Sequence, residues 1–184
     1  MAMVLIVLLV LILVLVVGGG IYLMTAYNGL VRLRNKIESA FAQIDVQLNR
    51  RHDLIPNLVE TVKGYATHEK ETLQAVIEAR NAAVAAEGTE AKAEAEGALS
   101  GMLRQVFALS EAYPDLKANT QFLDLQRQLS ETEDRIAYSR QYFNDNVRTY
   151  NTKIQSFPQN LIAKQMGFTE RQYFQADEES RANV

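Results

Sequence analysis

The sequence contains no cysteine, no tryptophan and only three prolines among its 184 residues. Without cysteine, disulfides, thiolate zinc sites and cysteine nucleophiles are excluded. The scarcity of proline, together with little strand-type alternation of apolar and polar residues, favours an all-α protein. The net charge of -3 argues against nucleic acid as a partner, because nucleic-acid binders usually carry a basic face.

Charged side chains are absent from the first 31 residues. Residues 3–17 are all Val, Leu, Ile or Met, and the apolar run resumes after the glycines at positions 18–20. At 1.5 Å per residue, residues 3–23 are long enough to cross the ~30 Å hydrocarbon core of a bilayer. We therefore predict a transmembrane anchor over residues 1–26, with the lipid bilayer as the first partner.

A cleaved signal peptide is the main alternative for this segment. Signal peptides have a basic stretch before a shorter apolar core, but here no Lys or Arg precedes the run. The sequence therefore favours a retained anchor. The triple glycine either admits a close neighbouring helix or marks a flexible point at the interface, and without a GxxxG spacing we prefer the second interpretation.

The flanking charges predict the orientation of the anchor. Basic residues are enriched on the cytoplasmic side of membrane spans. Only the terminal amine precedes the apolar run, whereas Arg32, Arg34, Lys36, Arg50 and Arg51 follow it, mixed with Glu38 and Asp45. We expect a single-pass protein whose helical domain lies in the cytoplasm.

Four amphipathic segments follow the anchor. The first carries an apolar stripe from Leu30 to Leu48 at three- and four-residue steps. The second is predicted to begin at His52 and Asp53, with Asp53 as N-cap and Pro56 in the first turn, and to end near Gly88. The third covers residues 89–112.

The fourth segment has the clearest period. Aromatic and aliphatic residues recur every seven positions. The apolar residues between them change their spacing along the segment, as expected when a straight helix of 3.6 residues per turn is compared with a repeat of 3.5. Because long helices joined by short turns favour antiparallel neighbours, we predict an elongated antiparallel four-helix bundle over residues 27–157, with a short helix and tail over 158–184. The recurring residues are Phe122, Leu129, Ile136, Phe143, Tyr150 and Phe157.

No catalytic, cofactor-binding or metal-binding motif stands out. The two histidines, His52 and His68, are sixteen residues apart and do not match a zinc motif. The triple glycine lies inside the apolar run, where no nucleotide could reach it. Glu90, Glu94 and Glu96 are predicted to be solvated surface residues. We therefore expect a protein that is not an enzyme and holds no metal or cofactor.

Residues 43–65 contain more polar side chains than a surface helix needs. Polar groups at a turn usually cap helix ends, and this is the simpler interpretation. The alternative is a partner-binding surface at the end of the bundle. The candidate residues for such a surface are Arg50, Arg51, His52, Asp53 and Asn57.

The same stretch carries a resemblance to the bacterial LemA family. Similar segments occur at residues 27–35, 150–158 and 167–174, so the resemblance covers nearly the whole chain. It implies a single N-terminal membrane helix, an antiparallel helical bundle and a place in the bacterial inner membrane. LemA-like proteins have no established enzymatic activity. The family has a magnetosome-associated branch, so membrane organisation is one role that the resemblance implies, although nothing in the sequence assigns this chain to that branch.

Two functions are preferred on the sequence over a third, an unrecognised enzyme, for which we expect no turnover. The first is a non-enzymatic membrane scaffold or adaptor that binds other membrane or envelope proteins, or itself as a homo-oligomer. The second is a pore-forming or membrane-remodelling assembly in which spans associate through residues 18–20. Polar pore-lining residues are scarce in the span, so the first function is favoured.

Overall fold

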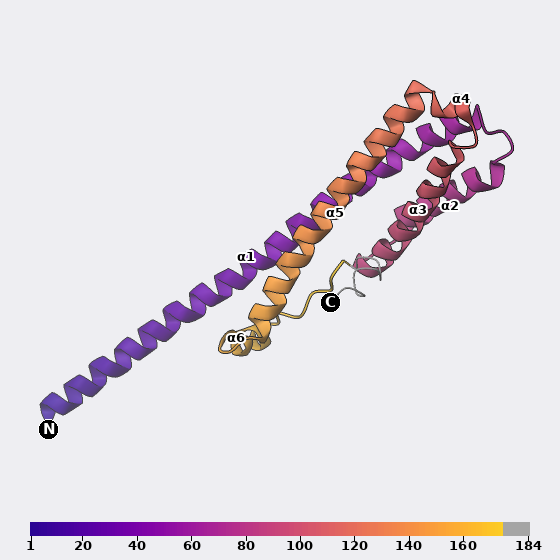
Figure 1. The fold of residues 1–184 in the computed structure, drawn as a ribbon. Helices are drawn as coiled ribbons and strands as arrows, with labels where there is room; N and C mark the ends of the chain where they lie inside the picture. The colour runs from indigo at the N-terminus through magenta and orange to yellow at the C-terminus, as the bar shows by residue number, and fades with distance from the viewer. Residues whose placement is uncertain (175–184) are drawn as a thin grey trace. The chain divides into compact units, whose positions relative to one another are not determined.

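The computed structural model of the chain describes residues 1–174, and every regular element in that part of the chain is an α-helix (Figure 1). This confirms the prediction of an all-helical protein that starts with a long apolar helix. The helices are α1 (Ala2–Lys63), α2 (Lys70–Ala85), α3 (Thr89–Leu109), α4 (Pro114–Lys117), α5 (Thr120–Gln155) and α6 (Gln159–Gln165).

Helix α1 contains the whole predicted span. From residue 3 to residue 17 every side chain is at least 51% exposed, so no described part of the protein covers this apolar surface. Among the described helices, α1 is the one that is long and apolar enough to cross a membrane. Burial in lipid is the arrangement that removes such a surface from water.

The chain divides into two compact units. Unit 1 consists of Met1–Glu38 and Asp145–Arg171, and it combines the start of α1, the end of α5 and α6. Hydrogen bonds hold the segment after α6 in place: the Tyr150 hydroxyl donates to the Thr169 carbonyl at 3.0 Å. The buried apolar side chains of this unit are Ala26, Leu30, Ile37, Val147, Tyr150, Ile154, Ile162 and Ala163.

Unit 2 consists of Ser39–Asn144 and, in the described part of the chain, residues 172–174. Its core is one cluster of side chains from α1, α2, α3, α4 and α5. Phe174 is also buried here, and its backbone N–H and C=O both bond to the carboxamide of Asn144 at 2.9 Å. Central members of the cluster are Ile55, Leu58, Val62, Val76, Leu99, Val106, Leu116, Phe122 and Leu129.

The predicted break between the first two segments is wrong. Helix α1 continues through Pro56 to Lys63, so Asp53 is not an N-cap, and the next helix begins only at Lys70. A proline inside a helix leaves the carbonyl four residues earlier without its N–H donor. Here the Arg80 guanidinium donates to that carbonyl, on His52, at 2.8 Å, which replaces the backbone hydrogen bond that Pro56 cannot make.

Phe157 also departs from the prediction. The seven-residue recurrence on α5 is buried from Phe122 to Tyr150, but α5 ends at Gln155 and Phe157 is 80% exposed. The ring of Pro158 disfavours helical geometry at the residue before it, which is Phe157. The last member of the pattern therefore lies outside the helix and outside the core.

We expect Leu129→Ala to lower the free energy of unfolding by about 2–5 kcal/mol, because it empties a buried leucine site in the unit 2 core. Urea unfolding of the full chain in detergent, followed by circular dichroism, measures this. Leu123→Ala on the same helix is the control, since Leu123 is half exposed and its loss should cost far less. Equal effects would contradict this description of the core.

Candidate partner-binding site and the buried charge network

Helical geometry separates the five predicted partner-binding residues into two faces. Because successive residues of an α-helix are about 100° apart, positions 50, 53 and 57 share one side of α1. Arg50, Asp53 and Asn57 are exposed, whereas Arg51 and His52 are buried in unit 2. The five predicted residues therefore do not form one surface, because three of them face solvent and two lie in the core.

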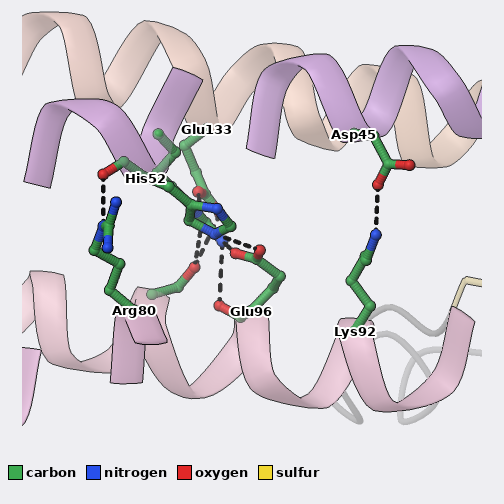
Figure 2. A network of polar contacts seen from close by, with 8 residues as sticks. Asp45, His52, Arg80, Lys92, Glu96 and Glu133 are labelled. Atoms are coloured by element: carbon green, nitrogen blue, oxygen red, sulfur yellow. Dashed lines mark hydrogen bonds and ion pairs between the residues drawn. The ribbon is translucent and has the colours of Figure 1, made fainter. Parts of the chain in front are cut away.

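Arg51 is the centre of a buried network of charged and polar groups. One terminal nitrogen, Nη1, donates to Ser100 Oγ at 2.9 Å and to Glu133 Oε2 at 2.5 Å. The other, Nη2, forms an ion pair with Glu96, whose side chain is fully buried like that of Arg51. His52 Nε2 donates to the second oxygen of Glu96 at 2.8 Å, because a carboxylate can only accept (Figure 2).

Four helices position these groups. Arg51 comes from α1, Glu96 and Ser100 from adjacent turns of α3, and Glu133 from α5. Helix α2 joins through Arg80, which donates to the backbone carbonyl of α1 described above (Figure 2). A polar partner on each helix favours one packing register, since any slip leaves a buried charge unpaired.

A second ion pair links α1 and α3 away from the network. Lys92 Nζ lies 2.7 Å from Asp45 Oδ1 (Figure 2). The same ammonium lies 5.3 Å from the centre of the Phe41 ring, a cation–π distance. Both charged side chains keep contact with water, so breaking this pair should cost less stability than removing one partner of the buried pair.

The electrostatics of the network keep Glu96 ionised. Burial raises the pKa of its carboxyl group, but the hydrogen bond from His52 and the charge and hydrogen bond of Arg51 lower it by more. The resulting pKa of Glu96 lies below its ordinary value. The favourable contacts of the folded state are therefore made with the charged form.

The prediction that Glu96 is a solvated surface residue is wrong, because its side chain is fully buried. Its position carried a signal of this: residue 96 lies three residues before Leu99 and seven before Leu103, in register with the buried stripe of α3. Arg51 is likewise in register with the buried stripe of α1, three residues after Leu48 and four before Ile55. A charged residue in register with an apolar stripe indicates a buried pair whose partner lies on another helix.

A cavity of about 290 Å³ lies beside the network, lined by Arg51, Ser100, Phe107 and Glu133 among others. The contacts of Arg51 with Ser100, Glu96 and Glu133 favour a structural role for its charge. Within residues 1–174, no group of three or more His, Asp or Glu side chains is arranged to hold a metal ion.

The outward face of α1 offers a different chemistry. Val46 and Glu60 extend the exposed group of Arg50, Asp53 and Asn57 at alternating four- and three-residue steps. This outward stripe combines an exposed apolar side chain with charges of both signs and an amide. Such a surface can form hydrogen bonds and ion pairs with another protein without disturbing the buried network.

We expect Arg51→Ala to destabilise the protein by about 3–5 kcal/mol, because it leaves the Glu96 carboxylate buried without its cation. Arg50→Ala removes an adjacent exposed arginine and should change stability by less than about 0.5 kcal/mol. Urea unfolding of the two full-length variants in the same detergent compares them. Similar losses in both variants would disprove the network's role.

The lowered pKa of Glu96 predicts a dependence of stability on pH. The stabilisation from its ionised form is complete above the unfolded-state pKa, about 4.3 for Glu, and is lost as pH falls through the lower folded-state pKa. Glu96→Gln lacks this titration. The stability difference between wild type and Glu96→Gln should therefore shrink below about pH 4.

Unfolding by urea between pH 7 and pH 3 tests this, with Glu94→Gln as the control at an exposed glutamate of the same helix. A difference between wild type and Glu96→Gln that stays constant over this range would show that the carboxylate of Glu96 is not stabilised by folding.

Three relatives are similar to most of this chain. Protein LemA of Metamycoplasma hominis is 29% identical over 162 residues, which cover 85% of this chain and 72% of the relative. Magnetosome protein MamQ 2 of Paramagnetospirillum magneticum is 26% identical over 179 residues, covering 83% and 66%. Magnetosome protein MamQ of Magnetospirillum gryphiswaldense is 26% identical over 178 residues, covering 83% and 65%.

This chain thus spans about two thirds of the length of the MamQ relatives. Residues 40–184 match the LemA family, which is well over half of the chain. These residues include the outward stripe of α1, the buried charge network and α6. With its N-terminal apolar helix, the chain is a membrane-associated helical protein that belongs to the LemA family.

Proposed function

We propose that this protein is a non-enzymatic, membrane-anchored scaffold or adaptor that binds other envelope proteins, or a second copy of itself. The observation that carries the proposal is the exposed apolar surface of residues 3–17, which begins the same helix that bears the outward stripe. Lipid can cover the first surface, and a protein partner can cover the second.

The proposal includes an arrangement in the cell. Residues 1–26 form the anchor, residues 27–157 an elongated antiparallel four-helix bundle, and residues 158–184 a short helix and tail. The bundle lies on the cytoplasmic side of the bacterial inner membrane, as the basic residues after the span favour. The relationship to LemA and MamQ proteins supports membrane association.

The contacts of the charged residues support a binding role more than a catalytic one. Arg51, Glu96 and His52 bond to one another inside unit 2. Arg50, Asp53 and Asn57 are directed to solvent on the opposite side of α1, and we propose them as the partner-binding residues, with Arg51 and His52 supporting them from the inside.

Membrane fractionation tests the anchor. We expect the intact chain to stay with the membranes after washing with high salt and alkaline carbonate, and to be released only by detergent, because lipid covers residues 3–17. Recovery of the intact chain in the aqueous fraction would contradict the proposal.

Site-specific photocrosslinking in cells tests the partner surface. A photoreactive amino acid at position 50 or 57 should give discrete products at the mass of two chains or of one chain plus a partner. Position 138, exposed on α5, is the matched control and should give weaker products. Monomer alone from positions 50 and 57 would exclude the outward stripe as the binding surface. Ion flux through liposomes containing the pure protein would favour a pore instead.

A further inference from the structure

Unit 1 exposes a second apolar surface that does not belong to the span. Phe157, Leu161 and Met166 are 80%, 61% and 58% exposed. Leu161 lies in α6, and the other two lie just before and just after it, whereas Ile162 and Ala163 of the same helix are buried. Three large apolar side chains that are exposed within ten residues of the chain are candidates for an interaction surface. These three side chains are called the α6 patch below.

Contacts within unit 1 place the α6 patch near the end of the span. The backbone N–H of Phe168 bonds to the carbonyl of Ala163 on α6 at 2.9 Å. The Phe168 ring packs edge-on against the ring of Tyr27, with centres 5.7 Å apart. Tyr27 lies only three residues after Met24, the last residue of the apolar run. The α6 patch is therefore tied to α1 at the level where α1 leaves the hydrocarbon.

The charge of unit 1 suits the surface of an anionic bilayer. It contains seven Arg and Lys residues against three Asp and Glu, a net charge of +4 in a chain whose total is -3. Exposed Lys164 lies in α6 itself, beside the apolar side chains. Apolar groups next to basic groups are the combination that binds at the interface of membranes with anionic lipids.

We propose that the α6 patch is a second membrane contact, which lies in the headgroup region of the same anionic bilayer that α1 spans. The charge argues for lipid over a second copy that binds through its own unit 1, because such a copy would present the same positive charge to this one. The contact would fix the rotation of α1 about its own axis. This inference rests on the anchor in the proposed function, but not on the scaffold role.

The absence of tryptophan from the chain allows a direct test. Phe157→Trp introduces a single fluorescent reporter into the α6 patch of the full chain. The protein is reconstituted into vesicles of phosphatidylcholine and phosphatidylglycerol with or without brominated acyl chains, which quench tryptophan on contact. We expect blue-shifted emission and roughly twofold or stronger quenching, because an interfacial indole reaches the acyl boundary.

Tyr138→Trp is the matched control, because Tyr138 is 72% exposed and lies in unit 2. Its emission should stay red-shifted and nearly unquenched. Leu161→Trp should repeat the result of Phe157→Trp. In both patch variants, quenching should be weaker in vesicles of phosphatidylcholine alone, and equal quenching would overturn the role of charge.

Other outcomes separate the two proposals. The protein could float with the vesicles while the indole at position 157 behaves like that at position 138. This outcome would overturn only the α6 contact. A blue shift without quenching would show a protein neighbour at the patch in place of lipid. This result would also overturn the proposed α6 contact with the bilayer. Failure of the chain to float with vesicles would overturn the anchor and the α6 contact together.

Discussion

The buried ion pair between Arg51 and Glu96 constrains how the helices of unit 2 can pack. Removing two such charges from water costs several kcal/mol for each ion, which only close and complete pairing offsets. His52, Ser100 and Glu133 add hydrogen bonds to the pair from α1, α3 and α5, while Arg51 Nε and His52 Nδ1 are buried without a hydrogen-bond partner among residues 1–174. Apolar stripes alone tolerate several packing registers, but here a change of register would leave a charge buried without a partner.

Helix α1 combines surfaces with three different environments because its helical geometry is not interrupted. Its first turns present apolar side chains on all sides, its later turns bury one face, and the opposite face carries Arg50, Asp53 and Asn57. Pro56 would ordinarily limit such a helix. Since Arg80 supplies the missing donor to His52, anchor, core and outward stripe belong to one element.

Charge divides the chain in a way that suits a membrane-anchored binding protein. Unit 1 has a net charge of +4, so the remaining residues of the chain, whose total is -3, carry a net charge of -7. Anionic lipids attract the first set and repel the second. The anchor and the α6 patch would therefore engage the bilayer, and the outward stripe would stay accessible to other proteins.

The sequence by itself determined the features that depend on neighbouring residues. The charge-free run predicted the apolar helix, three- and four-residue steps predicted the buried faces, and extended similarity indicated the LemA family. Only the tertiary structure decided that α1 continues through Pro56, that Glu96 is buried and ionised, and that Phe157 lies outside the core. Each of the first two depends on a partner from another helix, Arg80 or Arg51, and the third on where α5 ends. Local periodicity can indicate that a charged residue such as Glu96 is buried, but it does not identify the hydrogen-bond donor or the opposite charge that folding brings from a distant part of the chain.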